Sequence, residues 1–386
     1  MIPEGWLIST LENLIDIKHG FAFKSDYFRS EGEYILTTPG HFFEVGGFRD
    51  QGNKTKYYVG EVPKGYILNK GDVLLAMTEQ AAGLLGSAMY VPHSNKYLHN
   101  QRLGLVIVLD HERVCKEYIY LIYNSSTTRK IIAEQASGTK VKHTSPSKLL
   151  GVNVLIPPLS EQKKIAKILS TWDKAITTTE QLLNNSQQQK KALMQQLLTG
   201  KKRLTEFSGA WESAHLCNMA KIVKGKALSN RNLIDGEIPV IAGGKSSPYK
   251  HRDFTHEDVI TVSASGAYAG YVSYHPYKIW ASDCSVVVAR EGSDTGYIYQ
   301  LLTFRQNEIY SLQSGGAQPH IYPKDLESLK VIVPSLREQK AISSLLAVCD
   351  KEIKNLLKKL HFLKQEKKAL MQQLLTGKRR VKTEAA

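Results

Sequence analysis

Long apolar stretches are missing from this chain of 386 residues. No run approaches the roughly 18 apolar residues that a membrane-spanning helix requires. The first residues, MIPEGW, lack the basic and apolar regions of a signal peptide. We therefore expect a soluble, cytoplasmic protein that does not bind membranes.

Cysteine is also scarce. The four cysteines are far apart, and the chain has neither a Cys-x-x-Cys pair nor paired histidines at metal-ligand spacing. This pattern predicts reduced, structural thiols, without disulfides and without a metal site. The four are Cys115, Cys217, Cys284 and Cys349.

Catalytic motifs are missing as well. The loop GGKS at residues 243–246 resembles a phosphate-binding loop, but Pro239 stands where the first glycine is required. Gly-x-Ser-x-Gly and the Asn-Pro-Pro-aromatic box of amino-methyltransferases are absent. Two Glu-x-Lys pairs, at 161–163 and 338–340, would fit a nuclease motif, but an acidic residue at a helix start favours a structural role. We expect a non-enzymatic protein with no catalytic residue and no cofactor.

What the chain does contain is a long internal repeat. The twelve residues KKALMQQLLTGK occur at 190–201 and again at 367–378, an offset of 177 residues. A looser match, W-x4-L-x-N-x3-I-x2-G, begins at Trp6 and again at Trp211, whereas the segments between the two matches differ. The pattern indicates a tandem duplication into two domains rather than a solenoid. Further pairs at the offset of 177 are Pro157 and Pro334, Asp173 and Asp350, and Ser137 and Ser314.

The repeated ends predict two long helices. A heptad seam with alternating spacings of three and four begins at Ile165 and again at Ile342, and Gly200 and Gly377 supply a helix stop. Each helix should contain about 40 residues and extend about 60 Å. The seam residues are Ile165, Leu169, Trp172, Ile176, Leu183, Leu193 and Leu197 in the first helix, and Ile342, Leu346, Cys349, Ile353, Leu356, Leu360, Leu363, Leu370 and Leu374 in the second.

The two seams bury each other most simply as an antiparallel coiled coil with a pseudo-two-fold axis, because a parallel pair would require the second domain to cover some 60 Å. An ordinary helical bundle within one globule is the alternative. The chain therefore divides into a globular domain at 1–156, a helical region at 157–203, a second globular domain at 204–333 and a helical region at 334–386.

The two globular regions have the composition of mixed α/β domains, so we expect an α+β fold. Apolar runs predict strands, and each region should also contain a short helix, near 118–123 or 297–304. The predicted strands are 66–68, 72–76, 103–109, 259–262 and 285–289.

The net charge of +15 is concentrated on the helical regions. It divides into +2 for 1–156, +6 for 157–203, −1 for 204–333 and +8 for 334–386. The basic helices could contact DNA phosphate or an acidic partner, or form a solvated surface. Because the globular domains are nearly neutral, DNA binding there must depend on shaped loops, and tight binding should need further subunits.

Two variable domains, each followed by a long helix introduced by PPLSEQ or PSLREQ and ended by MQQLLTG, resemble the specificity subunit of a type I restriction–modification enzyme. The resemblance covers the whole chain. One departure is Arg337 in place of Ser160, which should weaken the cap of the second helix.

The resemblance implies a DNA-binding protein of phage defence. Each domain would be a target-recognition domain that reads one half of a bipartite double-stranded DNA target, and the helices would set the spacer. The helices would also dock two methyltransferase subunits, which carry the S-adenosylmethionine site for DNA methylation of adenine, and a motor-nuclease subunit would complete the complex. A coiled-coil protein scaffold and a related phage-defence complex that methylates without cutting are the alternatives.

Candidates for base contact are the polar side chains in loops beside the predicted strands, although any one of them could equally be a solvated loop residue. In the first domain they are Lys54, Lys56, Thr78, Glu79, Gln80, Asn100, Gln101, Arg102, Lys140 and His143. In the second domain they are Lys245, Ser246, Tyr249, Ser263, Ser265, Gln318 and His320.

Overall fold

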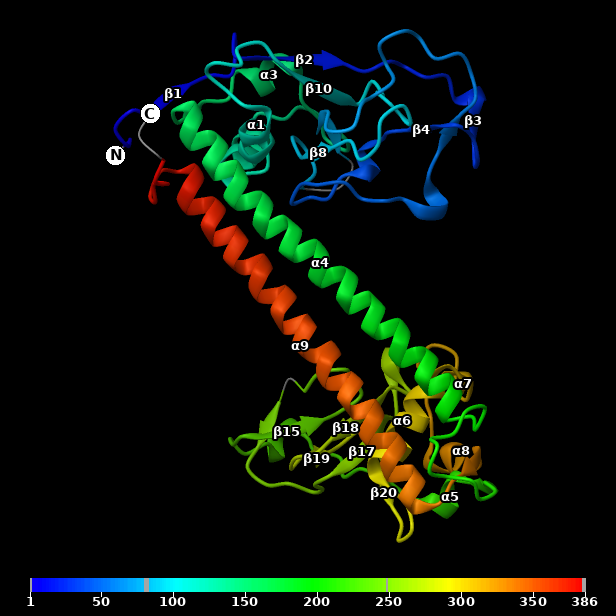
Figure 1. Cartoon of the computed structure of the whole chain (residues 1–386). Helices are drawn as coiled ribbons and strands as arrows, with labels where there is room; N and C mark the ends of the chain where they lie inside the picture. The colour runs from blue at the N-terminus through cyan, green and yellow to red at the C-terminus, as the bar shows by residue number, and fades with distance from the viewer. Residues whose placement is uncertain (1, 80–82, 248, 384–386) are drawn as a thin grey trace. The chain divides into compact units, whose positions relative to one another are not determined.

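The computed structural model describes residues 2–79, 83–247 and 249–383, which form two compact units (Figure 1). The first unit contains residues 1–178 and 360–386, and the second contains residues 179–359. The division runs through two long helices of 39 and 40 residues, α4 (Leu159–Leu197) and α9 (Leu336–Leu375). None of the described helices combines the length and the apolar character of a membrane span.

The first unit is built on a four-stranded antiparallel sheet with the order β2-β10-β6-β8. Its strands are β2 (Ile15–His19), β10 (Leu103–Val108), β6 (Val73–Ala76) and β8 (Ala88–Tyr90). Smaller sheets pair β1 (Leu7–Ser9) with β12 (Val154–Ile156), pair β7 (Thr78–Glu79) with β11 (Lys142–His143), and join β3 (Phe28–Arg29), β5 (Tyr57–Tyr58), β4 (Tyr34–Leu36) and β9 (Tyr97–Leu98). The short helices are α1 (Lys116–Tyr123), α2 (Ser126–Glu134) and α3 (Pro146–Leu150).

The second unit has a four-stranded sheet with the order β14-β20-β17-β18. Its strands are β14 (Ala220–Lys224), β20 (Cys284–Ala289), β17 (Val259–Ser263) and β18 (Val272–His275). Smaller sheets pair β13 (Glu212–His215) with β21 (Lys330–Val333) and join β16 (Lys250–His251), β15 (Ile238–Ile241) and β19 (Trp280–Ala281). The short helices are α5 (Leu216–Met219), α6 (Thr295–Phe304), α7 (Gln306–Ser311) and α8 (Pro323–Glu327).

The two four-stranded sheets have the same topology and the same register. In the first unit, Leu103 of β10 lies opposite Ala76 of β6, and in the second unit Cys284 of β20 lies opposite Ser263 of β17. The chain is thus a structural as well as a sequence duplication, and the predicted α+β class with repeated mixed domains is confirmed.

Each unit has a core that neither repeat completes alone. The first core contains Ile165 and Leu169 from the start of α4, together with Leu374 and Leu375 from the end of α9. The second core contains Ile342 and Leu346 from the start of α9, together with Leu197 and neighbouring apolar residues from the end of α4. Within each unit the two helices therefore run antiparallel, as predicted (Figure 1).

None of the predicted seam side chains is exposed: those at the helix ends are mostly buried, and those towards the middle are half-buried. The polar seam positions near the helix ends form ion pairs. Lys367 Nζ lies 2.5 Å from Asp173 Oδ1 in the first unit, and Lys190 Nζ lies 2.5 Å from Asp350 Oδ1 in the second. Each pair joins the lysine of one repeat to the aspartate of the other.

A buried glutamate at each helix start makes a second reciprocal contact. Glu338 accepts hydrogen bonds from Arg203 (2.6 Å from Nη2) and from Trp211 Nε1 (3.1 Å). In the first unit, Glu161 is bonded in the same way by Arg380 and by Trp6 Nε1. The repeated glutamate thus links the start of each long helix to the opening tryptophan and to the basic segment after the other helix. These contacts give the glutamate of each Glu-x-Lys pair a structural role.

Two details of the sequence prediction were wrong. Residues 66–68 do not form a strand, because turns at Gly65 and Gly71 leave room for only a single bridge, between Ile67 and Leu98. The cap of α9 is not weakened by Arg337, because the capping residue is Ser335, whose Oγ accepts from Glu338 N at 3.3 Å.

Removal of the Leu374 side chain should destabilise the first unit, although this residue belongs to the second repeat. Leu374 is 2% exposed within the first core. We expect Leu374→Ala to lower the local free energy of unfolding by about 2–5 kcal/mol. Hydrogen exchange measured on peptides of residues 103–123 reports the loss.

Leu357→Ala is the matched control, because this α9 leucine is 48% exposed and its truncation should change stability by no more than about 0.5 kcal/mol. If Leu374→Ala accelerated hydrogen exchange in residues 259–289 and not in 103–123, Leu374 would not belong to the first core.

Candidate nucleic-acid interface

Several predicted base-contact residues of the first unit meet at one end of the four-stranded sheet. Thr78 of β7 lies opposite His143 of β11. Arg102, which precedes β10, is tied to the same place because its carbonyl accepts from Met77 N at 3.0 Å. Thr78, Arg102 and His143 come from distant parts of the chain, and the sheet register brings them together.

A short hairpin closes this end of the sheet. Ser137 and His143 exchange backbone hydrogen bonds of 3.1 and 2.8 Å, and Lys140 lies exposed between them. Gly138 adopts φ 101°, and a Cβ atom there would lie 2.2 Å from the carbonyl oxygen of Val141. Only glycine fits this backbone, so the hairpin fixes where Lys140 and His143 lie.

The second unit repeats the hairpin. Ser314 and His320 exchange backbone hydrogen bonds of 2.9 and 2.8 Å, and Gly315 adopts φ 93°. Ser265 bridges His320 as Thr78 bridges His143, and Gln318 lies exposed on the hairpin. Each unit thus has a closed hairpin at the corresponding end of its own four-stranded sheet, and the two hairpins carry different side chains.

A basic loop lies beside the second hairpin. Lys245 Nζ lies 5.2 Å from the ring centre of Tyr268 and 5.3 Å from that of Tyr271, which is cation–π geometry. Gly243, in the same loop, comes close to Ser265, since a Cβ atom there would lie 3.0 Å from its carbonyl oxygen. Ser246 and Tyr249 are exposed in the following residues.

Three candidates are buried and serve the shape of the loops. Glu79, 5% exposed, accepts from the backbone N–H groups of Leu84 and Leu85 at 2.6 and 2.7 Å. Asn100, 9% exposed, accepts from Arg102 N at 3.0 Å, and Ser263 is 4% exposed. The Glu79 carboxylate and Asn100 Oδ1 accept from backbone N–H groups, and Ser263 Oγ lies 3.5 Å from the carbonyl oxygen of Ser265, so we propose that these side chains position the loops.

Three of the remaining candidates, Lys54, Lys56 and Gln101, have exposed side chains. Lys54 and Lys56 are exposed beside the small sheet that contains β5, and Gln101 is exposed on the loop before β10. Gln80 lies outside the described residues.

Burial sets the charge state of several groups behind these loops. It lowers the pKa of His99, next to Asn100, to about 4, so the ring is neutral at neutral pH. Burial also lowers the pKa of Arg129 to about 10, so this side chain stays charged. Arg129 donates to the carbonyl oxygens of Glu44 and Gly83 and so links these two segments of the first unit.

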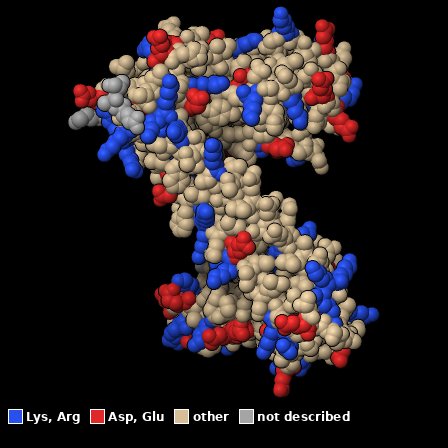
Figure 2. Space-filling view, in the orientation of Figure 1, with Lys and Arg blue, Asp and Glu red and all other residues tan. Residues whose placement is uncertain are grey.

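Residue-type reasoning missed Asp283, Tyr268 and Tyr271, which lie at the second cluster. Asp283 directly precedes β20 as Arg102 directly precedes β10, an equivalence that the strand register shows. Figure 2 shows acidic and basic side chains interspersed on the visible face of both units.

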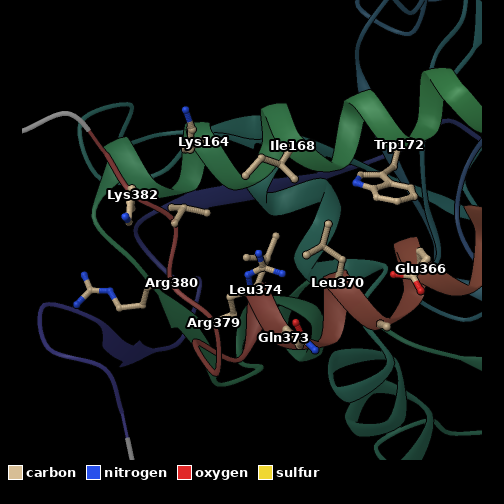
Figure 3. Close-up of a pocket in the computed structure, with 12 residues that line it drawn as sticks. Lys164, Ile168, Trp172, Glu366, Leu370, Gln373, Leu374, Arg379, Arg380 and Lys382 are labelled. Carbon is tan, nitrogen blue, oxygen red and sulfur yellow. The ribbon is translucent and has the colours of Figure 1, made fainter.

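A groove of about 780 Å³ lies in the first unit between the start of α4 and the end of α9 (Figure 3). Apolar residues including Ile168, Trp172 and Leu370 line it, and Lys164 and Lys382 stand at its basic margin. At the equivalent positions, 177 residues away, the second unit has Ala341, Leu345 and Cys349 in place of Lys164, Ile168 and Trp172. The groove therefore has an aromatic and a basic group that the second unit lacks at these positions.

Replacing Gly138 with alanine should open the first hairpin. Gly71→Ala is the control, because Gly71 also has positive φ (83°) but a Cβ atom there would meet no other atom within 4 Å. Both changes carry backbone strain of about 1–3 kcal/mol, and only Gly138→Ala adds a clash. Amide exchange at His143 should accelerate by roughly tenfold or more in Gly138→Ala, and equal exchange in the two variants would show that the hairpin does not depend on this glycine.

Comparison with known proteins identifies the family to which the chain belongs. Residues 3–186 and 209–364 match the model of the type I restriction modification DNA specificity domain. The putative type I restriction enzyme MjaX specificity subunit of Methanocaldococcus jannaschii is 27% identical over 99% of this chain and 95% of its own length. The MjaVIII specificity subunit of the same organism is 24% identical over 83% of this chain and 81% of its own.

The crystal structure of the type I restriction-modification S subunit from M. genitalium shares the fold, with a TM-score of 0.73 at 17% identity, covering 97% of this chain and 99% of that one. The predicted resemblance is confirmed: the chain belongs to the type I restriction–modification DNA specificity family, with one specificity domain in each half.

Proposed function

We propose that this chain is the non-catalytic DNA-reading subunit of a type I restriction–modification complex, and that each half reads one part of a bipartite double-stranded target. The observation that carries the proposal is the duplicated hairpin. Residues 137–143 in the first unit and 314–320 in the second form equivalent hairpins at the same end of equivalent sheets, with different polar residues between their ends. Equivalent scaffolds with different side chains suit two different half-sites, because base edges are read by side-chain hydrogen bonds.

The recognition domains are residues 1–156 and 204–333, and the helical regions are 157–203 and 334–386. We propose that two methyltransferase subunits dock on the helical regions and that motor-nuclease subunits join through the complex. The charge distribution supports docking there, because almost all of the excess positive charge lies on these regions. The groove beside Trp172 is also lined by Arg379 and Arg380, and aromatic and arginine side chains are enriched at protein interfaces.

The helices are proposed to set the spacer between the half-sites. Two features support this role: α4 and α9 are of nearly equal length, and their seam residues keep one heptad register. Heptad packing makes a stiff connection, and a stiff connection fixes the separation of two reading surfaces on B-DNA.

Gel shifts test the function. The chain assembled with a cognate methyltransferase should shift one class of duplex, at an affinity at least about 10³-fold above that for unrelated DNA. The chain alone should bind more weakly, because its globular domains carry little net charge. An assembled complex without any sequence preference would refute the DNA role and favour the protein scaffold. A methylating complex that never cuts DNA would favour the non-cleaving system.

Lengthening the helices tests the spacer role. Four residues inserted after Ser186 of α4 and after Glu352 of α9, which are hydrogen-bonded neighbours, add one turn to both helices. About 6 Å is gained, or roughly two base pairs at 3.4 Å each. The recognised spacer should lengthen while both half-sites keep their sequences.

The control is the same four-residue insertion between Ser30 and Glu31, in an exposed loop, which should change neither the spacer length nor the half-site sequences. A helix insertion that altered a half-site and left the spacer unchanged would show that the helices do not set the distance.

A further inference from the structure

One structural position carries opposite chemistry in the two units. Arg102 and Asp283 each directly precede the strand that lies second in its sheet, β10 or β20. The carbonyl of Arg102 accepts from Met77 N at 3.0 Å, and the carbonyl of Asp283 accepts from Ala264 N at 3.2 Å. The two residues are therefore equivalent, although one donates hydrogen bonds and the other accepts them.

Asp283 is held at the second hairpin with part of its carboxylate unused. Ser265 Oγ donates to Oδ2, and Ser265 itself bridges His320. In the described part of the chain, no Lys or Arg forms an ion pair with Asp283, and no donor is found for Oδ1. The side chain is half-buried, so one oxygen is oriented by the protein and the other remains available.

The guanidinium of Arg102 has no hydrogen-bond acceptor among the described residues, just as Asp283 Oδ1 has no donor there. Its side chain is exposed, and its backbone N–H donates to Asn100 Oδ1, which fixes the loop that carries it. Among the described residues, no carboxylate pairs with its guanidinium. The five N–H groups of this side chain are therefore available to an acceptor outside the protein.

A carboxylate on a DNA-reading surface has few uses. It is repelled by phosphates, and in the major groove it can accept a hydrogen bond only from the amino group of cytosine or adenine. Arginine has the opposite preference and binds the O6 and N7 acceptors of guanine.

We infer that Arg102 and Asp283 are equivalent specificity-determining residues, Arg102 reading a guanine in the first half-site and Asp283 reading the amino group of a cytosine or adenine in the second. This inference rests on the proposed DNA-reading function. The Ser265 hydroxyl positions the carboxylate for that contact.

Base analogues combined with substitutions test the pairs of contacts. Duplexes lacking the exocyclic amino group at single positions of the second half-site should bind the assembled wild-type complex roughly 10- to 100-fold more weakly at one position. In Asp283→Ala that analogue should cause no further loss. In the same way, 7-deazaguanine at one position of the first half-site should weaken binding by the wild-type complex and cause no further loss in Arg102→Ala.

Asp235→Ala and Arg113→Ala, both at exposed positions, are matched controls that should keep the full wild-type response to every analogue. The inference is overturned if Asp283→Ala and Arg102→Ala still respond to every analogue as the wild type does, or if Arg102→Ala weakens all sequences equally, as loss of a phosphate contact would. Failure of the proposed function looks different, because the wild-type complex would then show no sequence preference at all. Circular dichroism of each variant establishes that it is folded.

Discussion

The rest of the structure depends on an exchange of helix ends between the two repeats. The core of each unit is completed by leucines from the other repeat, such as Leu374 in the first core and Leu197 in the second. The buried glutamates Glu161 and Glu338 reinforce the exchange, since each binds an arginine from beyond the end of the other helix. Apolar burial supplies most of the stabilisation, while a buried ion pair chiefly penalises alternatives that leave one charge unpaired. Each of the two cores therefore contains residues from both repeats.

This exchange accounts for which parts of the two repeats are alike. The repeated KKALMQQLLTGK segments contribute the leucines and lysines that contact the other repeat, and the tryptophan at each opening donates to the buried glutamate. The loops that hold the candidate base-contact residues carry none of these contacts where the structure describes them, and they differ between the halves. Because the scaffold and the loops are physically separate, the loops are free to change without loss of the fold. The same separation allows Arg102 and Asp283 to occupy one position with opposite hydrogen-bonding character.

Sequence reasoning was strongest where structure depends on periodicity. The heptad spacing predicted both long helices, the reach of the chain between them predicted their antiparallel pairing, and Gly200 and Gly377 end them with φ of 69°. It was weakest in the loops, where residue type alone does not reveal burial: Glu79, Asn100 and Ser263 have polar side chains that face the protein. Asp283 escaped notice because insertions between the repeats change the offset between equivalent residues, from 205 at the opening to 177 at the helices. Only the strand register aligns Asp283 with Arg102.

The central claim is that two equivalent scaffolds read two different half-sites. Sequencing of modified bases in DNA methylated by the assembled complex tests it most directly. The account predicts a single bipartite motif, with two specified segments separated by an unspecified spacer of constant length. One uninterrupted motif, or methylation without any motif, would contradict it.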